Sequence, residues 1–152
     1  MRTAMVLLLF SLGLAGCAST PLGSPERDAA AKAFHTHPGH SAIYVYRPDP
    51  GEDASEADTV LYLDRRLIGS TLPRTYFRVD VQPGAHALRG VGIDQGAVAL
   101  STLPDELYFV ELRVSDGVSR YRMVDAETGK RAIRQCCVLL ENWSPGQRPL
   151  LR

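Results

Sequence analysis

Short apolar runs separated by polar turn residues fill most of the chain after residue 40. The runs are rich in β-branched and aromatic residues, and several alternate apolar with polar positions, which is typical of strands with one buried face. They cover residues 42–47, 59–63, 66–68, 75–81, 85–91, 98–103, 107–114 and 118–124. Because these strands follow one another at short spacing without interleaved helices, the pattern predicts an all-β fold, an antiparallel β-sandwich of the immunoglobulin-like or Greek-key type.

Turn residues mark the connections between these runs. The Asp-Arg pair at residues 64–65 and the Asp-Gly pair at residues 116–117 each predict a tight hairpin. The Pro-Gly pair at residues 83–84 predicts a turn, because proline presets φ and glycine accepts positive φ. Gly69 ends the second hairpin run, where we expect a backbone turn that favours glycine.

Two short helices are expected outside the strand region. Ser24 is a suitable N-cap and Pro25 a suitable first helical residue for an Ala-rich helix that reaches Phe34. A second helix is expected within residues 125–137, with Asp125 as its cap, although Gly129 lowers the helix propensity there.

The N-terminal residues have a different pattern. Met1-Arg2 is a positively charged start, and residues 4–14 form an uncharged apolar stretch. This stretch is roughly half of the ~20 residues that a membrane-spanning helix needs, so it predicts a signal helix that is cleaved from residues 1–16. Leu-Ala-Gly-Cys at residues 14–17 matches the bacterial lipobox, which predicts cleavage between Gly16 and Cys17 and lipidation of Cys17. The competing interpretation is an ordinary secretory signal followed by a chance cysteine.

The residues after Cys17 bear on where the protein would be held. Two or three acyl chains anchor a protein far more firmly than one, since each buried methylene adds ~0.8 kcal/mol. Ala18 and Ser19 stand where an aspartate commonly retains lipoproteins at the inner membrane. The resemblance to sorted lipoproteins therefore implies the periplasmic leaflet of the outer membrane. Residues 17–40 are then a lipidated tether with a short helix, residues 41–141 the β-sandwich domain, and residues 142–152 a loose C-terminal tail.

Charge narrows the range of partners. Lys and Arg number 17 and Asp and Glu number 17 among 152 residues. Removal of residues 1–16 also removes Arg2, which leaves 16 basic against 17 acidic residues. A near-neutral domain has no electrostatic footprint for nucleic acid or for anionic lipid headgroups, so neither is implied as a partner.

Three histidines within six residues form a candidate metal site: His35, His37 and His40. Imidazole is a preferred ligand of Zn²⁺ and Cu²⁺. The spacing matches no standard structural zinc pattern, and the Pro-Gly pair at residues 38–39 places the ligands in a loop. A solvated linker with incidental histidines is the alternative.

Two adjacent cysteines, Cys136 and Cys137, form a second candidate. Thiols can pair in an oxidising compartment, but Cys17 is committed to lipid and the chain has no other cysteine. Buried thiols, an intermolecular bridge and a vicinal disulfide therefore all stay open.

The remaining polar and aromatic clusters carry weaker signals. An acidic loop offers oxygen ligands for Ca²⁺ but lacks the spacing of a calcium loop, so a solvated loop is the simpler interpretation. Tyrosines on the predicted strands are expected in the core or on a sheet surface, with a ligand-binding face as the alternative. The chain has no G-x-S-x-G elbow and no Gly-rich phosphate loop, so we expect no catalytic residue, cofactor or small-molecule substrate. The acidic loop comprises Asp49, Glu52, Asp53, Glu56 and Asp58, and the tyrosines are Tyr44, Tyr46, Tyr62 and Tyr76.

Several of these stretches, taken in order, resemble a family of bacterial lipoproteins known as a domain of unknown function (DUF2846-like). The matching stretches are residues 24–34 (SPERDAAAKAF), 42–48 (AIYVYRP), 61–69 (LYLDRRLIG), 75–86 (TYFRVDVQPGAH) and 107–110 (LYFV). The resemblance implies a sandwich fold and an envelope location, and it implies no activity and no site residues. The C-terminal part, with Cys136-Cys137, matches least.

Two functional hypotheses follow from the sequence. The first is a lipid-anchored, non-enzymatic binding or scaffolding module of the periplasm. It would contact another envelope protein or the peptidoglycan through its loops or an exposed sheet edge. The alternative is a periplasmic metal-binding protein that uses His35, His37 and His40. An envelope hydrolase is a third class, which no residue pattern in the sequence supports.

Overall fold

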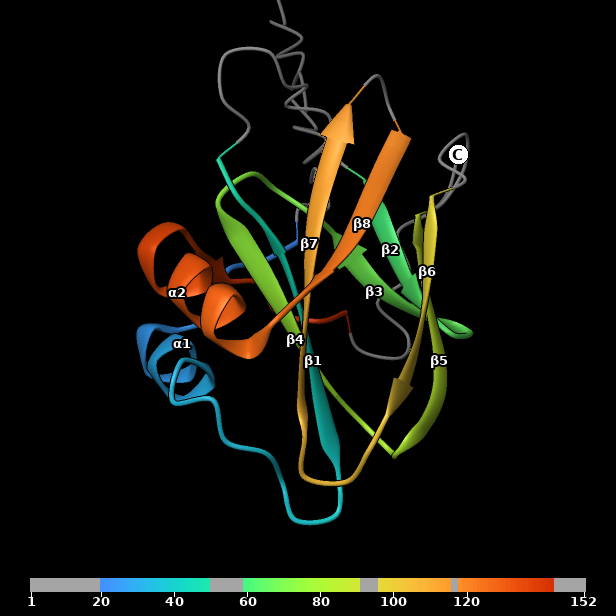
Figure 1. Cartoon of the computed structure of the whole chain (residues 1–152). Helices are drawn as coiled ribbons and strands as arrows, with labels where there is room; N and C mark the ends of the chain where they lie inside the picture. Colours follow the sequence, from blue (N-terminus) through green and yellow to red (C-terminus); the bar gives the residue numbers. More distant parts are fainter. Residues whose placement is uncertain (1–19, 50–58, 91–95, 116–117, 144–152) are drawn as a thin grey trace, which may run out of the picture.

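Two β-sheets and two helices make up the described part of the chain (Figure 1). The computed structural model describes residues 20–49, 59–90, 96–115 and 118–143. The expected signal helix, Cys17 and the turn at residues 116–117 lie outside these ranges. Within them, no helix is both long and apolar enough to cross a bilayer.

The larger sheet has five strands in the order β8-β7-β1-β4-β9. They are β1 (Ser41–Arg47), β4 (Thr75–Val81), β7 (Leu107–Ser115), β8 (Val118–Val124) and the short β9 (Val138–Leu139). β1 is antiparallel to β4 but parallel to β7, and β9 is parallel to β4. The expectation of purely antiparallel sheets was therefore wrong. Parallel neighbours need a long crossover connection, and here strands of the second sheet supply it between β1 and β7.

The second sheet is antiparallel throughout, in the order β3-β2-β5-β6. Its strands are β2 (Val60–Leu63), β3 (Arg66–Ser70), β5 (Gly84–Gly90) and β6 (Ala97–Thr102). The predicted hairpin between β2 and β3 is confirmed, with Asp64 at φ 55°. The turn expected at Gly69 was wrong: Gly69 lies inside β3 at φ 154°, where an added Cβ would be 2.9 Å from the Phe77 ring.

Apolar side chains of both sheets pack into one core. The alternation predicted for β4 is confirmed, because Phe77 and Val79 point into this core while Tyr76 points to the other face. Every residue of β1 is buried, which is typical of a central strand covered on both faces. The core comprises Ile43, Val45, Leu61, Leu63, Ile68, Phe77, Val79, Leu88, Leu100, Val110, Leu112, Val114 and Leu140.

Both helices lie on the outer face of the five-stranded sheet and form a second core there (Figure 1). α1 (Pro25–Ala31) begins at Ser24, whose hydroxyl accepts a hydrogen bond from the Arg27 amide. α2 (Ala126–Cys136) begins at Asp125, whose carboxylate accepts one from the Thr128 amide at 2.9 Å. Both predicted caps are confirmed.

The ends of the described chain are more firmly held than the sequence indicated. Residues 20–23, expected in a flexible tether, lie along residues 139–141, and Thr20 is buried. Trp143, expected in a loose tail, is only 8% exposed, and its amide donates to the carbonyl of Ile68. The composition of these segments is that of a loop, but their backbone groups form hydrogen bonds at the β9 edge of one sheet and the β3 edge of the other.

Candidate functional site

The three histidines of the candidate metal site each have a separate environment. The His37 ring lies 3.9 Å from the Asp80 carboxylate, and the His40 ring contacts the Gln82 amide at 2.7 Å. The His35 carbonyl accepts a hydrogen bond from Arg78. Within the described residues, no group of three or more His, Cys, Asp or Glu side chains is placed to hold a metal ion. The structure therefore adds nothing to the metal hypothesis.

The acidic loop falls almost entirely outside the described residues. Only Asp49 is described, and its carboxylate is 3.9 Å from Arg74, with both side chains about two-thirds exposed. An ion pair of this kind contributes little, because water screens it.

Three of the four tyrosines are buried between the large sheet and the helices. The Tyr44 hydroxyl donates to the carbonyl of Ala31, and burial raises the pKa of Tyr44 to about 12. The Tyr76 hydroxyl donates to Asp28, and burial together with that carboxylate raises the pKa of Tyr76. These two, with Tyr46, belong to the core, as expected. Tyr62 is half-buried on the second sheet beneath Arg89.

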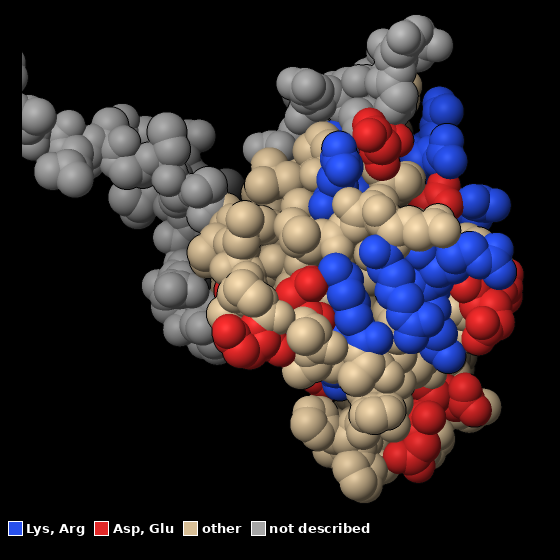
Figure 2. Space-filling view, turned by 90° about the vertical axis from the view of Figure 1, so that its left-hand side faces the viewer, with Lys and Arg blue, Asp and Glu red and all other residues tan. Residues whose placement is uncertain are grey.

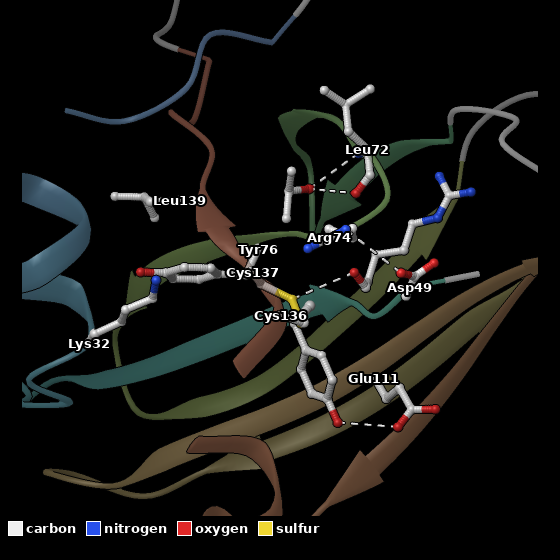
Figure 3. The surroundings of a disulfide bond; sticks show 12 residues. Lys32, Asp49, Leu72, Arg74, Tyr76, Glu111, Cys136, Cys137 and Leu139 are labelled. Atoms are coloured by element: carbon white, nitrogen blue, oxygen red, sulfur yellow. Dashed lines mark hydrogen bonds and ion pairs between the residues drawn. A yellow bond between two sulfur atoms is a disulfide. The ribbon is translucent and has the colours of Figure 1, made fainter. Parts of the chain in front are cut away.

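The two adjacent cysteines are bonded to each other (Figure 3). Cys136 is the last residue of α2, and Cys137 is buried with its sulfur 3.7 Å from the carbonyl of Arg47. Of the three states that the sequence left open, the structure has the vicinal disulfide. It closes a ring between the last residue of α2 and the residue that precedes β9.

A buried carboxylate, Glu111 of β7, is the centre of the most strongly charged site. Its side chain is 7% exposed and accepts hydrogen bonds from Arg113 at 2.6 Å and Arg122 at 2.7 Å. The Tyr46 hydroxyl donates to the same carboxylate at 3.2 Å from the core side (Figure 3). Burial alone would raise the pKa of Glu111, but the two arginines outweigh it and hold the pKa below 4.5. Burial and the nearby carboxylate raise the pKa of Tyr46 to about 12.

The surface over Glu111 is a shallow hollow of about 410 Å³, which we call the arginine hollow. Its lining residues are Glu111, Arg113, Arg120, Tyr121 and Arg122. Three guanidinium groups thus face one carboxylate, and Arg120 has no ion pair with any described residue. Lys and Arg side chains gather on one half of the helix-bearing face of the molecule, with acidic residues toward the rim (Figure 2).

The strand register explains how the arginine hollow forms. β7 and β8 pair so that Glu111 lies opposite Arg122, and Arg113 lies opposite Arg120. The side-chain period of two then places all four on one face. Sequence reasoning missed this site, although the alternation in residues 107–114 and 118–124, joined by a predicted hairpin, contains the signal.

A second hollow, of about 440 Å³, lies between α1, β4 and β9. Its charges are largely paired: Arg27 with Glu141, and Arg78 with Asp80 at 2.9 Å. Arg66 also lines it and has no ion pair with the described residues. This hollow carries less unbalanced charge than the arginine hollow.

Comparison with known proteins identifies one relative. A protein of Haemophilus influenzae, described only as uncharacterized, is 29% identical over 129 residues, which cover 81% of this chain and 76% of the relative. No family model and no solved structure matches the chain.

Proposed function

We propose that this chain is a lipid-anchored lipoprotein of the bacterial envelope whose β-sandwich is a non-enzymatic binding module. The arginine hollow would bind carboxylate groups of an envelope partner. Peptidoglycan is the first candidate, because its stem peptides carry free carboxylates. An acidic surface of another envelope protein would offer the same groups.

The observation that carries the proposal is the pairing of Arg113 with Arg120. Like charges directly opposite each other on antiparallel strands destabilise a sheet. Glu111 is already occupied by Arg113 and Arg122, so it does not neutralise Arg120. A carboxylate bound between the two guanidinium groups would remove the repulsion, and the planar guanidinium fork suits a carboxylate.

The topology supports the proposed orientation. The N-terminal residues 20–23 attach at the β9 edge of the five-stranded sheet, and the arginine hollow lies at the β8 edge. Four strand spacings of ~4.8 Å separate these edges, a distance of roughly 19 Å. An anchor at Cys17 would therefore hold one edge at the membrane and leave the other open to the periplasm.

Cosedimentation of the detergent-solubilised lipoprotein with isolated peptidoglycan tests the proposed ligand. We expect the native protein to pellet with the sacculi, and an Arg113→Ala/Arg120→Ala double variant to stay in the supernatant. Added salt should also release the native protein, because the site is exposed. An Arg65→Ala/Arg131→Ala variant, which removes two exposed arginines elsewhere, is the matched control. Equal pelleting of both double variants would refute the site.

Mass spectrometry of the mature N-terminus tests the anchor separately. The native chain should begin at an acylated Cys17, and Cys17→Ala should abolish both processing and acylation. An unmodified, secreted N-terminus would remove the anchor from the proposal and leave the ligand test standing.

A further inference from the structure

The chain enters the folded domain at one fixed place. The Thr20 hydroxyl accepts a hydrogen bond from the Ser70 amide at 2.8 Å, and the Pro21 carbonyl accepts one from the Glu141 amide at 2.8 Å. The Gly23 amide donates to the Leu139 carbonyl, also at 2.8 Å. These bonds fix the position of Thr20, whose side chain is buried, at the margin of the domain next to β3 and β9.

Covalent geometry limits how far Thr20 can lie from Cys17. Three peptide steps span at most about 11 Å. The headgroup layer of one leaflet is roughly 5–8 Å thick, as the difference between the whole bilayer and its hydrocarbon core requires. If Cys17 carries the lipid, the surface around Thr20 therefore lies at the headgroups, with no room for a spacer.

That surface has the composition of a membrane contact. Leu22 is 60% exposed, one of few large apolar side chains exposed in the described chain. Its neighbour Leu140 borders the second hollow, which Arg27 and Arg66 also line. We call the surface formed by Leu22, Arg27 and Arg66 the N-terminal face. Arg27 is paired with Glu141, which leaves the Arg66 guanidinium to bind a lipid phosphate, while the exposed Leu22 side chain suits the acyl boundary.

We propose that the N-terminal face docks on phospholipid headgroups, so that protein contacts as well as the lipid fix the orientation of the domain. This inference rests on the proposed lipidation of Cys17. The balanced charge of the whole chain gave no sign of it, because the net count hides how arginines are distributed over the surface. Arg66, which has no ion pair among the described residues, is available to a lipid phosphate.

Tryptophan quenching in vesicles tests the proposed contact. The lipidated Leu22→Trp variant is reconstituted into phosphatidylcholine–phosphatidylglycerol vesicles whose acyl chains are brominated near the headgroup. Leu103→Trp is the matched control, because Leu103 is 63% exposed and lies beyond β6, the edge of its sheet opposite β3. Trp143 is the only native tryptophan, and its emission is subtracted with the unsubstituted chain.

We expect the added emission of Leu22→Trp to be lost in brominated vesicles and that of Leu103→Trp to persist. Within the Leu22→Trp chain, Arg66→Glu should reduce the quenching, and Arg131→Glu on α2 should leave it unchanged. Unquenched Leu22→Trp emission from a chain that floats with the vesicles would overturn the docking face and leave the anchor intact. A chain that does not float with the vesicles would overturn the proposed anchor, and the docking face with it.

Discussion

Gly129→Ala is the substitution for which the structure reverses the ordinary expectation. Glycine inside a helix costs roughly 1 kcal/mol relative to alanine, so replacing it should stabilise α2. Gly129 is buried, however, and α2 rests on β7 at this point. An added Cβ would lie 2.5 Å from both Cβ and Cδ1 of Phe109 and closer still to Cγ.

The size of the effect follows from these distances. Carbon atoms pack at about 3.5–4.0 Å, so α2 or the Phe109 side chain must move by about 1 Å. The Phe109 Cβ is held next to the backbone of a central strand and cannot swing aside. Overpacking of a core costs about 1–3 kcal/mol, and the clash with several atoms places it near the upper value. After subtraction of the gain in helix propensity, we expect Gly129→Ala to lower the free energy of unfolding by about 1–2 kcal/mol.

Urea denaturation followed by circular dichroism measures this free energy. A double-mutant cycle with Phe109→Ala serves as the control, because this change removes the contacts with Cγ and Cδ1 but keeps the Phe109 Cβ, so Gly129→Ala should cost less in that background without becoming stabilising. A Gly129→Ala protein at least as stable as the native chain would refute the close packing of α2 on β7.

Three further substitutions test the energetics of the fold. Glu111→Gln should cost about 1 kcal/mol at neutral pH, as measured by urea denaturation. Because the folded pKa of Glu111 lies below 4.5, its contribution is full above the unfolded pKa and is lost as the pH falls through the folded pKa. The native chain should therefore lose more stability between about pH 7 and about pH 4 than Glu111→Gln, and parallel pH curves would contradict this. Arg120→Ala should increase the free energy of unfolding by about 0.2–1 kcal/mol and so raise the thermal midpoint slightly. A lower midpoint would show that the Arg120 guanidinium is paired. Asp28→Ala should cost about 2–3 kcal/mol by the same urea assay, since the carboxylate accepts hydrogen bonds from Tyr76 and the Leu139 amide, whereas Glu26→Ala, exposed on the same helix, should cost little.

Local chemistry was sufficient to predict most of the elements. Strand alternation located the strands, and the caps Ser24 and Asp125 act as predicted, because these signals depend only on residues near in sequence. The parallel pairing of β1 with β7 was not predictable in this way, since a strand's alternation reveals its faces but not its neighbours.

The short strand β9 was missed for a related reason. Two residues are too few to show a period. Their pairing with β4 depends on where the chain emerges from the end of α2. The arginine hollow was within reach, because the hairpin and the alternation together place its arginines opposite one another. Nothing in the residues around the histidines indicated that the His37 ring would lie near Asp80 and the His40 ring near Gln82.

The hydrogen bonds of residues 20–23 also define a mechanical path. A pull on the N-terminal end loads the Thr20–Ser70 bond first, the Pro21–Glu141 bond next and the Gly23–Leu139 bond last. These bonds open one after another, and none of them belongs to the apolar core between the sheets. Opening all of them frees four residues, which lengthens the linker between Cys17 and the folded domain by about 13 Å while α1 and both sheets stay folded. The segment is thus a reserve of length that force can draw out without unfolding the domain.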